Sequence, residues 1–414
     1  MNFVGYQCSK CGERYELAEL IYTCPEDGSN LDLRLDYAAI QASVSLESIS
    51  ASREGSIWRY LPLLPVGDPG NKGTQLWAVG WTPLIRSSQL AEGLGLKALW
   101  LKDDGRNPTA SLKDRASAVV VARAHEIGAH TVVTASTGNA GAALAGMAAA
   151  VHVPAVILAP ANAPQAKVAQ LLIYGAQVVL VDGNYDQAFD LSLEAAEEFG
   201  WYCRNTGYNA FTAEGKKTAA FEICEQLSDP GVDRWEAPEA VFVSVGDGNI
   251  ITGLHKGFKD LFELSWIDHI PRIYGVQSTG SAAVTHAFEA GAEEIRPVQS
   301  DTIADSISVD LPRDGLRALR AVRETGGAMI AVEDGVILES IRALGGEAIF
   351  AEPAGATAHA GLEAAVGKGW VGQGERIVVV ITGSGLKDVP AAMRAAGKAT
   401  VIEPTLDALR EVVR

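Results

Sequence analysis

The chain has 414 residues, which favours two or three domains of about 150 residues each. Hydrophobic residues make up 48% of it and charged residues 21%, so it is too apolar for a disordered chain. Acidic residues outnumber basic residues by 51 to 34, and the resulting net charge of −17 disfavours a broad surface for nucleic acid or anionic membranes.

Residues 1–35 are predicted to form a small, turn-rich segment. They lack the charged start and apolar core of a signal peptide, and five cysteines are too few for a disulfide framework, so a cytoplasmic location is expected. Cys8, Cys11 and Cys24 resemble three ligands of a zinc ribbon whose fourth position holds Asp27 instead of a cysteine. Two interpretations stay open: a structural zinc site, or a ribbon that has lost its metal and is held by packing.

Residues 36–80 show a looser, partly Ser-rich pattern. The segment contains Trp58, Tyr60 and Trp77, whose large apolar surfaces favour burial. We therefore expect an extension that packs on the main body of the protein.

From residue 81 onward, short β-branched runs alternate with helical patterns, which indicates parallel sheets covered by helices on both faces. The most apolar stretch, 140–160, is interrupted by His152, Pro154 and Pro160, and it is predicted to be a buried helix followed by a strand, with no membrane span. The predicted strands are 98–102, 131–134, 155–158, 177–181, 241–245, 272–277, 329–332 and 376–381, and the clearest predicted helices are 114–125, 165–174, 186–199 and 251–264.

Several common catalytic motifs are absent from the sequence. No strand is followed by G-x-G-x-x-G, and there is no G-x-x-x-x-G-K-[ST], G-x-S-x-G or H-E-x-x-H. The seven histidines are scattered. Metal-dependent hydrolysis and Ser-His-Asp catalysis are therefore disfavoured.

The loops that follow predicted strands carry the candidate chemistry, because ligands of α/β sheets bind beyond the carboxyl ends of strands. After the strand 98–102, Ser111 is predicted to cap a helix with Asp114 as its capping-box partner. Lys113 then lies in the first helical turn, where the helix dipole favours its neutral amine, the form that attacks carbonyl groups. The alternative is a solvated lysine that pairs with Asp114 or Asp104.

The next two loops are candidate anion sites. Ser136, Thr137 and Asn139 follow the strand 131–134 at the start of an Ala-rich helix, where they could bind a carboxylate or merely cap the helix. The run Gly246, Asp247, Gly248, Asn249 and Ile250 follows the strand 241–245 and could turn backbone N–H groups toward a phosphate. The carboxylate of Asp247 is expected to point away or to cap its own turn. An ordinary strand-to-helix turn is the alternative.

The fourth loop begins with Thr382 at the end of the strand 376–381. Its hydroxyl could face a heterocycle nitrogen, or it could bond to local backbone. Together the four loops would supply an imine-forming lysine, a carboxylate site, a phosphate site and a ring-nitrogen partner. This set matches pyridoxal phosphate (PLP).

The chain resembles the threonine synthase branch of the fold type II, or β-family, PLP enzymes. The resemblance rests on runs that occur in this order: WTPL (81–84), NPTASLKDR (107–115), STGN (136–139), AEGKKT (213–218), VGDGNI (245–250), EPA (352–354) and TGSGLKD (382–388). It implies two doubly wound α/β domains like those of the tryptophan synthase β subunit. The larger domain would comprise 81–111 and 227–414, and the smaller one 112–226, with the cofactor between them.

The resemblance also implies residue roles. Lys113 would carry the cofactor covalently and act as the mobile acid and base, and Asn139 would bond the cofactor's 3′-oxygen. Residues 246–250 would hold its phosphate, and Thr382 would face the pyridine nitrogen. Ser136 and Thr137 would bind the substrate carboxylate.

The activity implied is the conversion of O-phosphohomoserine and water to L-threonine and phosphate by a homodimer. An alternative is a serine/threonine dehydratase, or a β-replacing synthase acting on O-phosphoserine. It is favoured by Ala140 and Gly141, where the family has hydroxyl residues, and by Thr212, where it often has arginine. A third possibility is a non-catalytic protein that binds the cofactor or a partner through its ribbon.

Overall fold

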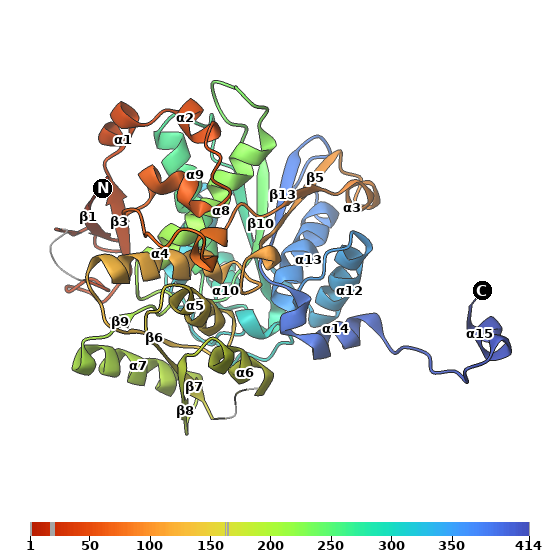
Figure 1. Ribbon diagram of the computed structural model, residues 1–414. Helices are drawn as coiled ribbons and strands as arrows, with labels where there is room; N and C mark the ends of the chain where they lie inside the picture. Colours follow the sequence, from red (N-terminus) through yellow and green to blue (C-terminus); the bar gives the residue numbers. More distant parts are fainter. Residues whose placement is uncertain (1, 17–20, 162, 164, 414) are drawn as a thin grey trace.

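The computed structural model describes residues 2–16, 21–161, 163 and 165–413. A six-stranded sheet of order β12-β11-β10-β13-β5-β4 forms its larger part (Figure 1). All neighbouring strands are parallel except β4 and β5, which are antiparallel. The strands are β4 (Leu84–Arg86), β5 (Ala98–Asp103), β10 (Ala240–Ser244), β11 (Arg272–Ser278), β12 (Met329–Val332) and β13 (Arg376–Ile381).

Both faces of this sheet are buried, as continuous apolar strands require. In β10, Val241 and Val243 contribute to one hydrophobic core, whereas Ala240 and Phe242 contribute to another. The helices of this part are α3 (Ser88–Gly93), α9 (Asn249–Glu263), α10 (Ala283–Glu289), α11 (Gly315–Glu324), α12 (Asp334–Gly346), α13 (Pro353–Gly367) and α14 (Val389–Ala396).

The second sheet has the order β8-β7-β6-β9, and all of its strands are parallel. It contains β6 (Val132–Ala135), β7 (Ala155–Pro160), β8 (Gln177–Val181) and β9 (Tyr202–Cys203), with the helices α4 (Lys113–Glu126), α5 (Asn139–Ala150), α6 (Gln165–Ile173), α7 (Tyr185–Phe199) and α8 (Phe211–Leu227). The eight predicted strands and the helix–strand interpretation of 140–160 are confirmed. The short strands β4 and β9 were not predicted.

The N-terminal segment forms an antiparallel sheet, β2-β1-β3, from β1 (Phe3–Cys8), β2 (Arg14–Tyr15) and β3 (Leu31–Leu35). The extension that follows contains α1 (Tyr37–Ser43) and α2 (Leu46–Ser50). The side chains of Trp58 and Tyr60 are buried, and the Tyr60 hydroxyl donates to Glu225 of α8. Residue Tyr60 of this segment thus contacts the helix α8.

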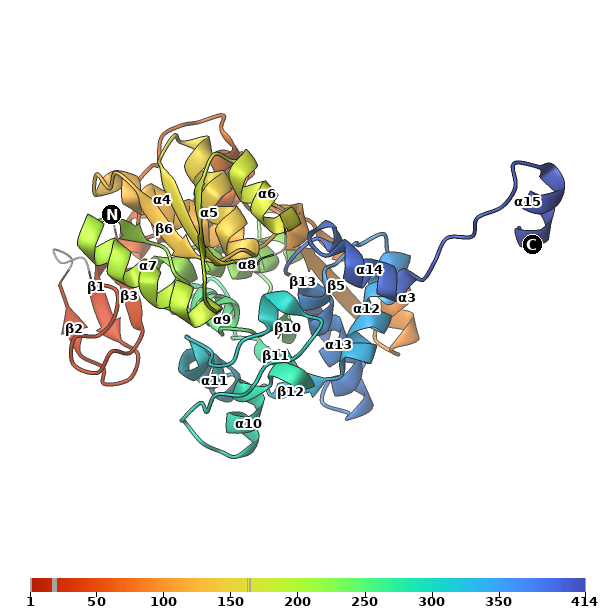
Figure 2. The same ribbon diagram turned by 90° about the horizontal axis from the view of Figure 1, so that it is seen from below.

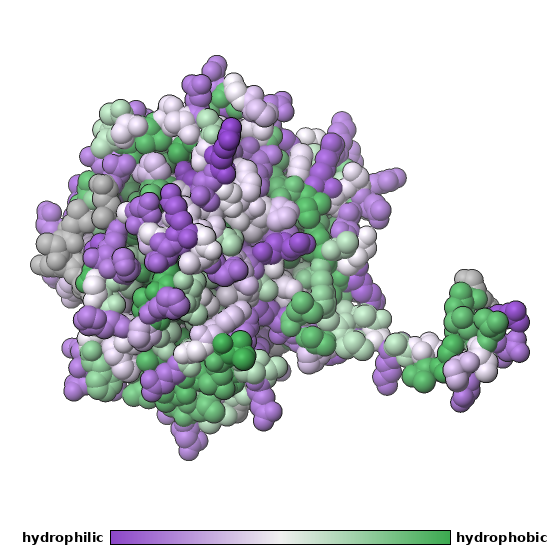
Figure 3. Space-filling model, viewed as in Figure 1, coloured by the Kyte–Doolittle hydropathy of each residue, from purple (hydrophilic) through white to green (hydrophobic). Residues whose placement is uncertain are grey.

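The C-terminal segment after α14 leads away from the body to α15 (Leu406–Val412), which has no buried residue (Figures 1 and 2). Apolar side chains are exposed on this segment, among them Val401, Leu406 and Val413 (Figure 3). Among the described residues, no helix is both long and apolar enough to cross a membrane.

Candidate active site

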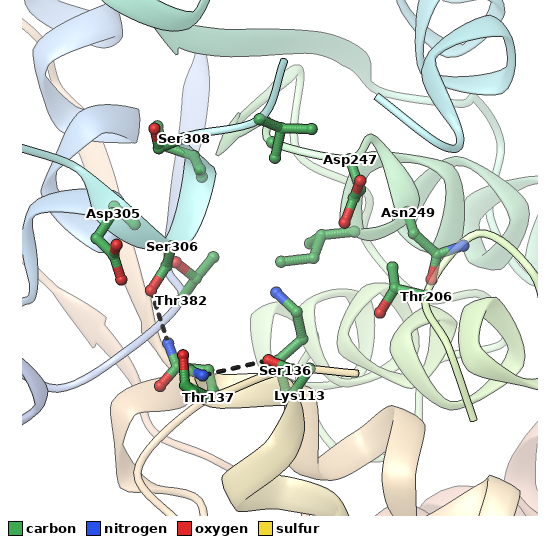
Figure 4. Close-up of a pocket in the computed structure, with 18 of the residues that line it drawn as sticks. Lys113, Ser136, Thr137, Thr206, Asp247, Asn249, Asp305, Ser306, Ser308 and Thr382 are labelled. Atoms are coloured by element: carbon green, nitrogen blue, oxygen red, sulfur yellow. Dashed lines mark hydrogen bonds between the residues drawn. The ribbon is translucent and has the colours of Figure 1, made fainter. Parts of the chain in front are cut away.

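Residues from all four predicted loops line one cavity of about 430 Å³. Its walls come from α4, β6 and α5 on one side and from β10, β13 and α13 on the other (Figure 4). The predicted cofactor and substrate residues that line it are Lys113, Ser136, Thr137, Asn139, Gly246, Asp247, Gly248, Asn249, Ile250 and Thr382. The structure therefore brings together every residue proposed for these roles.

Lys113 is the first residue of α4, and its side chain points into the cavity (Figure 4). Burial lowers the pKa of its ammonium group, and the neighbouring Arg204 lowers it further. Both effects favour the neutral amine that carbonyl chemistry needs. The alternative of a lysine that pairs with Asp114 or Asp104 does not apply, because among the described residues Lys113 forms no ion pair within 4.0 Å. Asp114 accepts hydrogen bonds from Thr109, and Asp104 pairs with Arg115.

The predicted capping box at this helix is wrong. Leu112 occupies the cap position, and the Ser111 hydroxyl is buried without a hydrogen-bond partner. The loop is held by tertiary contacts instead: the Leu112 N–H donates to the Thr382 carbonyl at 2.9 Å, and the Ser384 N–H donates to the Ala110 carbonyl at 3.0 Å. These two bonds couple the position of Lys113 to that of Thr382.

Asn139 begins α5, and neither it nor Ser136 caps this helix through its side chain. The Ser136 hydroxyl instead accepts a hydrogen bond from the Gly138 N–H at 3.2 Å, within the loop. The Asn139 amide donates to Glu352 at 2.7 Å. A Cβ atom on Gly141 would lie 2.1 Å from the Ser136 carbonyl oxygen, so close packing accounts for glycine at this position.

The loop 246–250, the candidate phosphate site, presents backbone N–H groups at the start of α9. Gly248 caps α9 with φ of 95°, and no side chain caps this helix, so its first N–H groups stay available to an anion. A Cβ atom on Gly248 would lie 2.6 Å from the Asp314 carbonyl oxygen, and one on Gly246 would lie 2.9 Å from the Ile307 Cα. The glycines were expected to leave room for a phosphate, but they also allow the close approach of the segments that contain Ile307 and Asp314.

The sequence predicted that Asp247 points away from the cavity or caps its own turn, and the structure shows neither. Its side chain lies in the cavity wall (Figure 4), and its carboxylate accepts a hydrogen bond from the Arg313 N–H at 3.3 Å, so it does not cap its own turn. Burial raises its pKa, whereas the nearby Lys113 and Lys216 lower it. These cations explain how an acidic side chain is accommodated beside an anion site.

Thr382 is buried at the end of β13, and its hydroxyl is 3.5 Å from that of Ser244. The cavity thus presents a lysine with a lowered pKa, an uncapped helix N-terminus and a buried hydroxyl. These groups fit the aldehyde, the phosphate and the ring nitrogen of PLP.

Glu352 was part of a recognised run but had received no role. It accepts the hydrogen bond from Asn139, and burial raises its pKa to about 7. Because the folded-state pKa lies above the ordinary value of 4.5, folding stability should fall as the pH rises from about 4.5 through 7. We expect Glu352→Gln to have nearly the Tm of the wild type at pH 5 and a Tm higher by a few degrees at pH 8. A Tm difference that does not change with pH would show that Glu352 keeps an ordinary pKa.

Sequence reasoning missed several polar lining residues, among them Arg204, Thr206 and Lys216. Arg204 and Thr206 directly follow the two-residue strand β9, too short to be recognised from its pattern. Lys216 lies in α8, and both it and Arg204 have fully buried side chains. The position of residues 204–206 at the carboxyl end of β9 could have indicated a ligand site, had that strand been recognised.

A second cluster lies outside this cavity, in the N-terminal segment. Candidate ligand atoms of Cys8, Cys11, Cys24 and Asp27 all lie within 4.8 Å of one another. The sulfurs of Cys11 and Cys24 are 3.7 Å apart, and Cys8 Sγ is 3.5 Å from an Asp27 oxygen. Tetrahedral zinc with bonds of about 2.3 Å needs sulfur–sulfur edges of about 3.8 Å, so these four residues fit a metal.

Comparisons with known proteins agree with this reading of the site. The chain is 40% identical to a threonine synthase of Methanocaldococcus jannaschii over 99% of both chains, and 36% identical to one of Methanosarcina acetivorans over 98% of both. A threonine synthase of Mycobacterium tuberculosis is 34% identical over 82% of this chain and 90% of its own. The fold resembles that of threonine deaminase isoform 2 from Solanum lycopersicum, with a TM-score of 0.65 and 24% identity over 83% of this chain and 94% of that one. A family model described as pyridoxal-phosphate dependent enzyme matches residues 77–383, and the chain belongs to this family.

Proposed function

We propose that this protein is a PLP-dependent threonine synthase that converts O-phosphohomoserine and water to L-threonine and phosphate. The observation that carries the proposal is the similarity to archaeal threonine synthases along nearly the whole chain, N-terminal segment included. The cavity supports it with a group for each part of the cofactor. The same cavity has room for an amino-acid substrate beside the cofactor.

The position of each cavity residue indicates the role it would have in this reaction. Bound PLP supplies the electron sink that makes the protons of an attached amino acid acidic. The Lys113 amine is placed to take a proton from the substrate and return it at a neighbouring carbon. Ser136 and Thr137, at the start of α5, would bind the substrate carboxylate, because hydroxyls and N–H groups there donate to anions. Thr382 offers the ring nitrogen a neutral hydroxyl.

A substrate panel tests this function against its alternative. The purified enzyme is given O-phosphohomoserine, L-threonine, L-serine or O-phosphoserine, and release of phosphate, threonine and keto acids is followed. We expect the highest kcat/KM for O-phosphohomoserine, with equal amounts of threonine and phosphate. Preferential keto-acid formation from threonine or serine would instead identify the dehydratase. Preferential turnover of O-phosphoserine would identify the β-replacing synthase.

We also propose that Cys8, Cys11, Cys24 and Asp27 bind one structural zinc ion. Three thiolates and a carboxylate complete a tetrahedral site and leave no position for a reactive water. Elemental analysis of protein purified without chelator should give about one zinc per chain. Cys24→Ser should lower both the zinc content and the Tm, whereas Cys203→Ala, at a buried cysteine outside the cluster, should keep the zinc. Zinc near zero would exclude the site, and loss of turnover on chelation of a still-folded enzyme would contradict a structural role.

We also propose an oligomeric state, a location and a domain division for the protein. A homodimer is expected from the resemblance, and the exposed apolar side chains of the C-terminal segment support association. A cytoplasmic location agrees with five unpaired cysteines. The negative net charge argues against a nucleic-acid partner. The proposed domains are 1–35, 36–80, 81–111 with 227–414, and 112–226, and each parallel sheet falls within one of the two large units.

A further inference from the structure

Asp314 lies directly before α11 and contacts the candidate phosphate loop. It is fully buried, and its backbone N–H donates to the Asp247 carbonyl at 2.8 Å. Its carboxylate accepts a hydrogen bond from the Asn249 amide at 2.7 Å. Its carbonyl lies so close to Gly248 that no side chain fits between them. One acidic residue thus contacts three consecutive residues of the loop.

Asn249 is held at both ends of its side-chain amide. Its nitrogen donates to Asp314, whereas its oxygen accepts hydrogen bonds from the Thr212 hydroxyl at 3.0 Å and from the Lys216 amino group. Asn249 is also the first residue of α9, the helix whose free N–H groups form the candidate phosphate site. The position of Asp314 therefore helps to fix where this helix begins.

Arg317, in the first turn of α11, joins Asp314 to the N-terminal segment. Its guanidinium donates to one oxygen of the Asp314 carboxylate from Nε at 2.5 Å and to the other from Nη2 at 2.8 Å. Its Nη1 donates to the Asp32 carboxylate at 2.7 Å and to the Leu31 carbonyl at 3.1 Å. Because Asp314 and Arg317 are both buried, this two-pronged ion pair fixes both side chains.

The strand that supplies these acceptors, β3, also borders the cysteine cluster of the N-terminal segment. Leu31 lies opposite Cys8 in the pairing of β3 with β1. The Asn30 carbonyl accepts a hydrogen bond from the Ser9 N–H at 2.9 Å. The Asn30 amide donates to the Arg313 carbonyl at 3.1 Å. A continuous series of hydrogen bonds thus leads from the cluster to the phosphate loop.

A metal bound at the cluster would hold β3 in place. Segments shorter than about 40 residues have too little core to order themselves, and a metal commonly supplies the missing stability. Without the metal, β3 would become more mobile, and Arg317 would lose two of its acceptors. A buried guanidinium must then find other acceptors, which would draw it away from Asp314. The support of the phosphate loop would weaken as a result.

We propose that Asp314 and Arg317 are positioning residues through which metal binding at the cysteine cluster strengthens the binding of PLP. The inference rests on the proposed function, because it takes zinc and PLP as the two ligands. Neither residue lines the cavity, so both act on the cofactor through the loop 246–250. Coupling between two binding sites is reciprocal, so PLP strengthens zinc binding by the same factor.

Two dissociation constants test the coupling without any turnover. The Kd for PLP is measured by absorbance on zinc-loaded apoenzyme, dialysed free of unbound metal, and again on apoenzyme after chelation. We expect the zinc-free form to bind PLP about 5–50-fold more weakly, a usual strength of coupling between two sites. Competition with a chelator should show that the holoenzyme binds zinc more tightly than the apoenzyme by the same factor. Equal values in either comparison, or no bound zinc, would overturn the proposal.

Three variants show whether the coupling depends on these residues. Arg317→Lys keeps the charge but loses the planar fork, so the ratio of the two Kd values for PLP should fall below about twofold. Asp32→Ala removes a partly exposed acceptor of Arg317 and should lower the ratio to about half or less. The control is Glu324→Ala, which removes an exposed carboxylate of α11 that pairs with Lys259, and it should keep the wild-type ratio. A lower Tm with an unchanged ratio in Arg317→Lys would show a merely structural role and contradict the proposal.

The variants also decide the matter if chelation unfolds the protein. In the zinc-loaded forms, Arg317→Lys and Asp32→Ala should raise the Kd for PLP by about 3–10-fold, and Glu324→Ala by less than about twofold. Equal Kd values in the three proteins would overturn the proposal. Threonine formation from O-phosphohomoserine is measured separately. If the zinc-loaded enzyme makes no threonine, the proposed function fails, and the Kd values still decide the coupling.

Discussion

Replacing Lys113 by alanine should abolish the absorbance band of the bound cofactor near the visible range and lower threonine formation by about 10³-fold or more. The reason is that, in the proposed function, one side chain has two tasks: it would carry the cofactor, and its amine would move protons on the substrate. Its location at the first position of α4, inside the cavity and with a lowered pKa, supports both tasks.

Chemical labelling gives the control for this variant. Borohydride reduction of the wild-type holoenzyme, followed by peptide mapping, should place the cofactor on Lys113. Lys216 is the relevant competitor, because it is buried in the same cavity and its pKa is also lowered. A label on Lys216, or an unchanged spectrum in Lys113→Ala, would contradict the assignment.

Gly248→Val should weaken PLP binding by about 10–100-fold. A φ of 95° is a conformation that a β-branched residue adopts only at a cost of about 1–3 kcal/mol, and the new Cβ would meet the Asp314 carbonyl. The loop must therefore shift, and its N–H groups lose their common direction. Equilibrium binding of PLP to the apoenzyme, followed by its absorbance, measures the effect.

Asp247→Asn is the matched control in the same loop. Asparagine keeps an acceptor for the Arg313 N–H and removes a negative charge from the neighbourhood of a bound phosphate. We expect its Kd for PLP to stay within about threefold of the wild-type value. A large loss in Asp247→Asn with little loss in Gly248→Val would show that a side chain, and not the backbone, holds the phosphate.

The strands could be predicted because those of a parallel sheet are buried on both faces and show as apolar runs. The predicted runs 329–332 and 376–381 coincide with β12 and β13. In the two larger sheets the missed strands, β4 and β9, have three and two residues, too few for a pattern. Their existence depends on pairing with β5 and β6.

The location of the site followed from one rule, that ligands gather at the carboxyl ends of parallel strands. The conformation of the individual loops could not be predicted in this way, because it depends on tertiary contacts. Ser111 looked like a helix cap, but hydrogen bonds to residues 382–384 fix the loop. Ala110 has φ of 67°, a conformation that favours glycine and that no local sequence pattern indicated.

Sequence reasoning could not place the buried cations Arg204 and Lys216 in the cavity, again because tertiary contacts decide where they lie. A charged residue is normally expected at the surface, and nothing in the sequence separates Lys216 from Lys217. Only the fold shows that Lys217 meets carboxylates whereas Lys216 faces the cavity.

Turnover of O-phosphohomoserine in ¹⁸O-labelled water tests the central claim most directly. If the enzyme eliminates phosphate and then adds water at the neighbouring carbon, one ¹⁸O atom should appear in the hydroxyl group of threonine. The released phosphate should contain none, because its bridging oxygen leaves with it. Mass spectrometry of both products decides the matter. Label in the phosphate together with homoserine would identify a phosphatase, and phosphate released with a keto acid in place of threonine would contradict a threonine synthase.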